Sequence, residues 1–341
     1  MDGWRVVEMV ASVLLAAALL AWGLPLVAGA DWADIRGVLG ALSSLQVGAL
    51  TAVWLAGLWV HTVALAAAMP GLSHRRAFFL NLTGSSVSNM LPLGGAAGTA
   101  LNYTTSRAWG FSTGAFLRWA LVTNIWDTLG KLVVPGVALV WLAFDSTEPP
   151  EALVGAAVGA LVLLVVLVAL TWLVLHREFG ARVVGRLLDW AVGRLRLPVP
   201  EDGGYAGRAQ EFRRDLSALI AAAWWRLSLG KAGYAVFQAL LLWLCLSWLG
   251  GEVSPATAFA VFAAERVLSL AVITPGATGV VEIGMAGMLV AFGVTPAVAA
   301  AGVLLYRAFI VGFEIPAGAA AMLWWLIRRG HARRVEAQGQ P

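Results

Sequence analysis

Leu91–Gly98 (LPLGGAAG) and Thr274–Gly279 (TPGATG) interrupt two apolar segments, which run from about residue 78 to 103 and from about 258 to 292. Proline removes a backbone donor and glycine permits tightly bent backbone, so each stretch predicts a break between two helices. The two segments occupy corresponding places in the two halves of the chain. Paired interruptions of this kind favour a transporter built from inverted repeats, with the binding site where the helices break.

The composition indicates an integral membrane protein. Of 341 residues, 60% are hydrophobic and 12% are charged, and apolar runs of membrane-spanning length recur along the chain. The net charge of +4 comes from basic segments that report membrane orientation rather than nucleic-acid binding. Four dispersed histidines and the single Cys245 predict neither a metal site nor an intrachain disulfide. We expect no cofactor and no nucleic-acid partner.

A spanning length of about 20 residues predicts six full transmembrane helices. They cover approximately Val6–Val27, Leu45–Ala68, Thr113–Phe144, Ala152–Leu175, Leu227–Leu249 and Ala297–Ile327. Arginines concentrate before and after the first interrupted segment, in the long central loop and in the tail. The positive-inside rule then places both termini and the central loop in the cytosol, and it makes the two interrupted segments re-entrant hairpins that enter from opposite faces.

The predicted fold is therefore all-α and integral to the membrane, with two inverted-topology repeats. Each repeat has three transmembrane helices and one re-entrant helical hairpin. The first repeat covers 1–144 with its hairpin at about 78–103, and an external loop follows at 145–151. The second repeat covers 152–327, with a cytosolic amphipathic connector at about 176–226 and a hairpin at about 258–292, and residues 328–341 form a basic cytosolic tail.

Both breaks contain the pattern GxxG at the start of a second half-helix, namely Gly95–Gly98 and Gly276–Gly279. The N-terminus of a helix carries about half a positive charge and presents free amides, so the pattern predicts sites for an anion such as a phosphate headgroup. The candidate binding residues at the breaks are Asn89, Gly95, Gly98, Pro275, Gly276, Thr278 and Gly279. The alternative is that each segment is a kinked helix or a pair of short spans.

At these residues the chain resembles the transmembrane region of lysylphosphatidylglycerol synthases. The resemblance rests on Asn89–Gly95 (NMLPLGG), Thr274–Glu282 (TPGATGVVE) and Leu305–Arg307 (LYR), and it covers nearly the whole chain. It implies a module that flips or handles a lipid, and in the full synthases this module translocates aminoacylated phosphatidylglycerol. Members often carry an acidic residue and an arginine just after the first break, where this chain has alanines and a threonine. The longest polar region is too short for the soluble aminoacyl-transferase domain of the full enzymes, so we expect no enzyme.

Ionisable residues at membrane depth are costly and mark a pathway or an internal pair. Arg307, expected to be unpaired, and Glu282 are the main candidates for substrate binding. The alternatives are an ion pair of Arg307 with Glu282 or Glu314, and a capping role for Glu282 at the second break. Asp127 and Lys131 are four residues apart in one helix and are expected to pair. The predicted intramembrane charge network comprises Arg118, Asp127, Lys131, Glu265, Arg266 and Glu314, with Glu265 and Arg266 near the outer interface.

Two functions fit these features. The first is a transporter or flippase in the cytoplasmic (inner) membrane, which handles an anionic phospholipid or a polyprenyl-phosphate-linked lipid in a cavity between the repeats. The second is a non-catalytic scaffold or partner subunit for a membrane enzyme, such as a glycosyltransferase. The chain has no nucleophile, nucleotide-binding or zinc-hydrolase motif, and this speaks against an enzyme.

Overall fold

The computed structural model describes residues 3–91, 94–145, 204–270 and 274–338, together with residues 158, 159, 162, 165, 166 and 169. All regular elements among these residues are helical, as expected in lipid, where a helix satisfies its own backbone hydrogen bonds. Most of the predicted fourth span (152–175), most of the loop 145–151 and the connector up to residue 203 lie outside the described residues.

The helices follow one another in a simple order. They are α1 (Gly3–Ala18), the π-helix η1 (Leu19–Gly23), α2 (Leu24–Ala28), α3 (Trp32–Gly40), α4 (Ser44–Ala68), α5 (His74–Met90), α6 (Gly95–Ala108), α7 (Thr113–Asp145), α10 (Gly204–Trp248), α11 (Pro255–Leu268), the single 3₁₀ turn η2 (Pro275–Ala277), α12 (Val280–Ala291), α13 (Pro296–Arg307), the π-helix η3 (Ala308–Phe313) and α14 (Glu314–Gln338).

Five helical stretches in the described parts of the chain are long and apolar enough to cross a membrane. They are Val10–Ala28, Ser44–Ala68, Thr113–Phe144, Gln210–Trp248 and Pro296–Arg328. Each corresponds to one of the predicted spans, so the chain is a multi-pass helical membrane protein. Two helices are longer than predicted: α10 begins at Gly204 and α14 continues to Gln338. Neither extension contains a proline, so nothing stops these helices where their polar residues begin.

The chain divides into two compact units. Unit 1 consists of residues 1–62, 73–110 and 232–341, and unit 2 consists of residues 63–72 and 111–231. Helices α4 and α10 run from one unit into the other. Each unit takes segments from both of the predicted repeats, so the compact units are not the sequence repeats.

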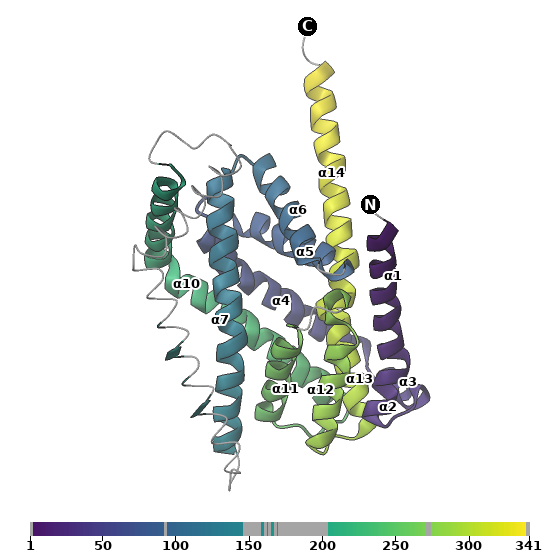
Figure 1. Ribbon diagram of the computed structural model, residues 1–341. Coiled ribbons are helices and arrows are strands. Elements are labelled where there is room, and N and C mark those ends of the chain that lie inside the picture. Colours follow the sequence, from purple (N-terminus) through teal and green to yellow (C-terminus); the bar gives the residue numbers. More distant parts are fainter. Residues whose placement is uncertain are drawn as a thin grey trace. The chain divides into compact units, whose positions relative to one another are not determined.

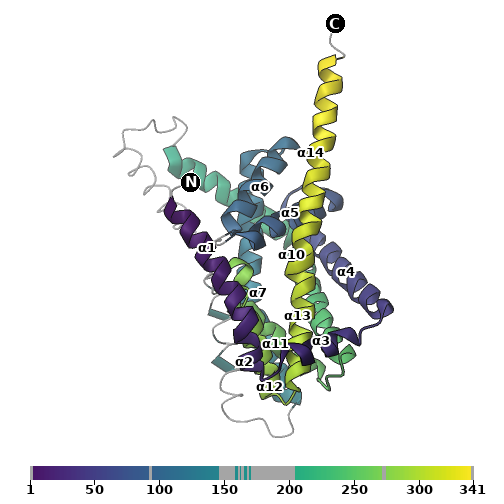
Figure 2. The ribbon, with the colours of Figure 1, turned by 90° about the vertical axis from the view of Figure 1, so that its right-hand side faces the viewer.

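In unit 1, each interrupted segment is a pair of packed helices joined by a break: α5 with α6, and α11 with α12. Figure 2 shows α5 and α6 side by side. Their contact is close because glycines face each other. A Cβ atom on Gly98 would lie 2.5 Å from the carbonyl oxygen of Gly84, and a Cβ atom on Gly84 would lie 2.5 Å from Nδ2 of Asn102. The predicted sequence of helix, break and helix is therefore present at both places.

The C-terminal helices support the first of these pairs. Helices α13, η3 and α14 form one long continuous rod (Figure 1), and α14 packs along α5. The Ser86 hydroxyl donates to the carbonyl of Ile315 at 2.8 Å, and a Cβ atom on Gly318 would lie 2.5 Å from Cβ of Ser86. Helix α3, which the sequence indicated only as a loop, packs on α13 and buries Ile35 completely.

Candidate functional site

The second break is a turn of non-helical backbone between α11 and α12. Gly276 and Gly279 have positive φ angles of 59° and 91°, and Ala277 has a φ of 53°. Glycine adopts this region freely, whereas a side chain makes it costly. The Thr274 hydroxyl donates to the carbonyl of Thr278 at 2.7 Å and closes the turn. The two glycines of the predicted GxxG pattern are therefore needed for the shape of the backbone.

Glu282 and Arg307 hold this turn together. The Gly279 amide donates to Oε2 of Glu282 at 2.6 Å, and Nε of Arg307 donates to Oε1 of Glu282 at 2.7 Å. Nη2 of Arg307 donates to the carbonyl of Gly276 at 2.7 Å. We call Arg307, Glu282 and the backbone of Gly276 and Gly279 the Arg307 clasp. It joins α13, α12 and the turn before α12 through charge-assisted hydrogen bonds.

The expectation that Arg307 is unpaired is wrong. Its partner is Glu282, which was the alternative that the sequence left open, and Glu282 also caps α12. The two residues are only 6% and 3% exposed. The carboxylate of Glu282 occupies the position where an anion would bind at the N-terminus of α12. In this conformation the Gly279 amide at the second break is therefore already hydrogen-bonded to Glu282.

The clasp extends to Glu265 and Arg266 of α11. Nη1 of Arg307 lies 3.6 Å from Oε1 of Glu265, and Nε of Arg266 donates to Oε2 of Glu265 at 2.5 Å. Arg266 also lies over the ring of Phe262 at 5.0 Å. Glu265 is 2% exposed, so its side chain lies inside the protein. Its position on α11 directs it toward α12 and α13, where its carboxylate lies beside the guanidinium group of Arg307.

Glu314 begins α14, beyond the π-helix η3. It is 3% exposed, and the hydroxyl of Ser85 on α5 lies near its carboxylate. An ion pair of Glu314 with Arg307 was one of the alternatives from the sequence, yet no ion pair joins the two in the described part of the chain. The wider turns of η3 between them change their angular spacing.

The first break is different, because the N-terminus of α6 is open. Gly95 and Ala96 are exposed, the first turn has no acidic residue, and no side chain caps it. The first bond of the helix runs from the Gly98 amide to the Gly94 carbonyl at 2.9 Å. Gly95 has no neighbour where a Cβ would be, whereas Gly98 is packed against α5. Of the two predicted glycines, Gly95 lies at the open end and Gly98 serves helix packing.

The two breaks meet in unit 1. The C-terminal end of α5 contacts η2, and a Cβ atom on Gly276 would lie 3.4 Å from Oδ1 of Asn89. Asn89 belongs to the first interrupted segment and Gly276 to the second, so segments nearly 190 residues apart in sequence come together here. This contact is consistent with the prediction that both breaks contribute to a single site.

Two π-helices flank the second break, and periodicity did not reveal either. Leu19 of η1 packs on Gly279, where a Cβ atom would lie 2.9 Å from Cδ1 of Leu19. Helix η3 directly follows Arg307, and Val311 of η3 is 3.7 Å from the Cβ position of Gly276. Such widened turns occur often at functional sites.

The remaining predicted charges belong to unit 2. Asp127 accepts a hydrogen bond from Lys231 of α10 at 2.6 Å, a partner on another helix that spacing along α7 did not reveal. Arg118 of α7 donates to Asp215 of α10 at 2.8 Å. The predicted network is therefore split: Glu265, Arg266 and Glu314 adjoin the Arg307 clasp, and Arg118 and Asp127 connect α7 with α10.

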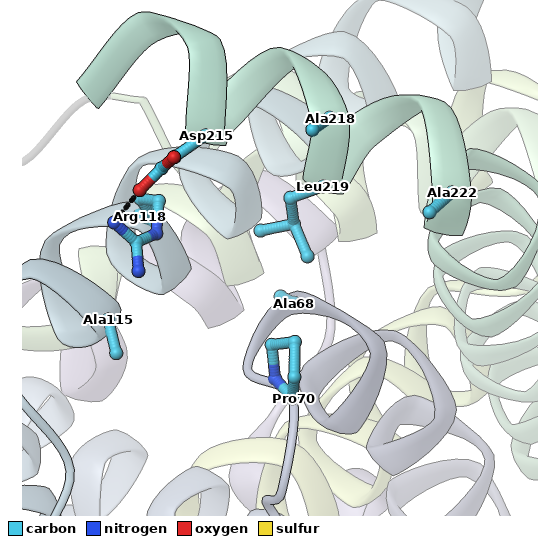
Figure 3. A pocket seen from close by; sticks show the side chains of 8 residues that line it. All are labelled: Ala68, Pro70, Ala115, Arg118, Asp215, Ala218, Leu219 and Ala222. Atoms are coloured by element: carbon cyan, nitrogen blue, oxygen red, sulfur yellow. Dashed lines mark hydrogen bonds and ion pairs between the residues drawn. The ribbon is translucent and has the colours of Figure 1, made fainter. Parts of the chain in front are cut away.

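The Arg118–Asp215 pair borders a groove of about 330 Å³ between α7, α10 and the end of α4 (Figure 3). Its other lining residues are apolar: Ala68, Pro70, Ala115, Ala218, Leu219 and Ala222. The side chains of the pair are 27% and 50% exposed. The pair is thus accessible, in contrast to the buried clasp.

Replacing Arg118 with alanine is expected to change the stability of the protein by no more than about 1 kcal/mol, because an accessible ion pair contributes little net free energy. Thermal unfolding of the purified protein in detergent measures the effect. A loss of several kcal/mol would contradict the assignment of this pair as a peripheral contact.

Comparison with known proteins finds a family match over most of the chain. The family profile described as "Lysylphosphatidylglycerol synthase TM region" matches residues 9–318. No curated protein matches the chain. The matched region contains both breaks, the Arg307 clasp and Glu314. The chain therefore belongs to the family of lysylphosphatidylglycerol synthase transmembrane regions.

Proposed function

We propose that this protein moves an anionic lipid across the cytoplasmic membrane, and that the lipid phosphate binds at the first helix break. The proposed lipids are an anionic phospholipid or a polyprenyl-phosphate-linked lipid. In this proposal the pairs α5–α6 and α11–α12 are re-entrant hairpins from opposite membrane faces, the repeats are inverted, and both termini are cytosolic. The protein performs no chemistry on the lipid.

The open N-terminus of α6 is the observation that carries the proposal. Non-helical backbone is tolerated at membrane depth only where it is buried in protein or lines a water-filled cavity. The second break is buried and satisfied by Glu282 and Arg307. At the first break, Gly95 and Ala96 are exposed and the first turn of α6 has no acidic residue. Free amides with a positive helix end suit a phosphate group.

Two further features support a lipid ligand. The name of the family refers to a phospholipid, lysylphosphatidylglycerol. The first break also contacts the second through Asn89 and η2, so binding at α6 can influence the position of the Arg307 clasp. In alternating access, a fixed site of this kind lies where two repeats move against each other.

A carboxylate placed at the open helix end tests the proposal. The variant Ala96→Glu is expected to reduce translocation of the anionic lipid about tenfold or more, because it puts a fixed negative charge where the phosphate binds. The helix itself should be stabilised by roughly 0.3–1 kcal/mol, so the protein should remain folded. The matched control Ala96→Gln has the same size without the charge and should retain most of the activity.

The measurement is a leaflet-resolved translocation assay in proteoliposomes, with a fluorescent anionic phospholipid and with a polyprenyl phosphate in separate preparations. Equal rates for Ala96→Glu and Ala96→Gln would exclude phosphate binding at α6. If the wild type translocates neither lipid, the transport proposal fails, and the scaffold function becomes the better account.

A further inference from the structure

We infer that Glu314 is a proton-binding site and that it is protonated when the Arg307 clasp is closed. This inference goes beyond lipid transport, because the site is defined by the buried charges of unit 1. It also suggests the proton as the ion that a transport cycle could use.

The charge balance of the buried network carries the inference. The described residues around the clasp supply three carboxylates, Glu265, Glu282 and Glu314, and two guanidinium groups, Arg266 and Arg307. Glu282 pairs with Arg307, and Glu265 pairs with Arg266 and lies 3.6 Å from Arg307. Glu314 is the carboxylate left without an ion pair in the described part of the chain. If all five groups were ionised, the network would keep one uncompensated negative charge, which is unfavourable at membrane depth.

The surroundings of Glu314 favour the neutral acid. The polar group of α5 near it is the Ser85 hydroxyl, and the ionisable residues of α5 all lie in its first turn, at His74, Arg75 and Arg76. Helix η3 presents no ionisable residue. Arg266 of α11 and Arg307 of α13 act on Glu314 through space, but both already have carboxylate partners. One hydroxyl bond is too little to stabilise a buried carboxylate.

A second observation is the hydroxyl of Tyr306, which precedes Arg307 on α13. Tyr306 is 0% exposed and its hydroxyl has no hydrogen-bond partner in the described structure. It interacts electrostatically with Glu265, Arg266 and Arg307. This buried hydroxyl can donate to a carboxylate of the network when the partners of Arg307 change.

The consequence is a competition for Arg307. With Glu314 neutral, Arg307 is held by Glu282 and the second break is closed. When Glu314 loses its proton, the network gains a third carboxylate that attracts the same two guanidinium groups, and the bond between Arg307 and Glu282 weakens. Proton release and opening of the clasp are therefore coupled, since each state favours a different partner for Arg307.

Glutamine substitutions test the inference in the full-length protein. Glutamine resembles a protonated glutamic acid, so Glu314→Gln should fold and melt like the wild type, whereas Glu282→Gln should lower the melting temperature because Glu282 is ionised in the clasp.

Infrared spectroscopy gives a readout that needs no lipid. The wild type should show the carbonyl band of a protonated carboxylic acid. The band should be shifted in frequency in Ser85→Ala, and it should be absent in Glu314→Gln. If the band persists in Glu314→Gln, or if Glu314→Gln is destabilised as much as Glu282→Gln, the inference is wrong. Because no transport is measured, a failure here leaves phosphate binding at α6 to be judged by its own assay.

Discussion

Replacing Arg307 with alanine should destabilise the protein by about 3–5 kcal/mol, because removal of one partner leaves a buried, uncompensated charge. The uncompensated group is Glu282, which is 3% exposed, and the carbonyl of Gly276 also loses its donor. We expect a lower melting temperature and a smaller monodisperse fraction in size-exclusion chromatography in detergent.

The matched control for this experiment is Arg118→Ala, which removes an arginine from an accessible ion pair. A second comparison is the double variant Arg307→Met with Glu282→Leu. It removes both charges and should recover part of the stability, because apolar groups of similar size can replace a buried ion pair. If Arg307→Ala melts like Arg118→Ala, the clasp does not hold the second break.

Gly98→Val should lower the stability by about 1–3 kcal/mol, the usual cost of inserting extra atoms into a packed interface. The first added atom, Cβ, would lie 2.5 Å from the carbonyl oxygen of Gly84, and this backbone group cannot move away as a side chain can. Helices α5 and α6 would have to separate. Thermal unfolding in detergent measures the loss.

Gly95→Val provides the control within the same break. Gly95 begins the same helix, but no atom lies within 4 Å of the position its Cβ would take. Gly95→Val should therefore change the stability of the protein very little. Similar melting temperatures for the two valine variants would show that α5 and α6 are not packed closely through Gly98.

The predicted spans could be derived from the sequence because they depend on length and hydrophobicity. Spans such as Ser44–Ala68 and Thr113–Phe144 are found at the predicted residues, since a long apolar run has few alternatives in a membrane. The breaks were equally predictable, because proline and glycine act on the local backbone. Helices α10 and α14 exceed their predicted bounds because hydropathy reports where a span leaves the apolar region and not where the helix ends.

The partners of the charged residues could not be predicted in the same way. Spacing along one helix favoured Asp127 with Lys131, and it could not reveal that Asp127 bonds to Lys231 of another helix, more than 100 residues away. The sequence also left open an ion pair of Arg307 with Glu314, and the π-helix η3 lies between the two residues. The sequence predicted an anion site at both breaks. The structure shows the amide of the second break already occupied by Glu282, while the N-terminus of α6 is open.

Local chemistry alone thus defines a multi-pass helical protein with two broken apolar segments and an arginine near the second. These properties follow from hydrophobicity and from the backbone limits of proline and glycine, which act within a few residues. The contact of Asn89 with the second break, the closed Arg307 clasp and the unpaired carboxylate of Glu314 arise only when distant helices pack. Burial and ion pairing depend on which side chains meet across helices, and that is a property of the folded chain.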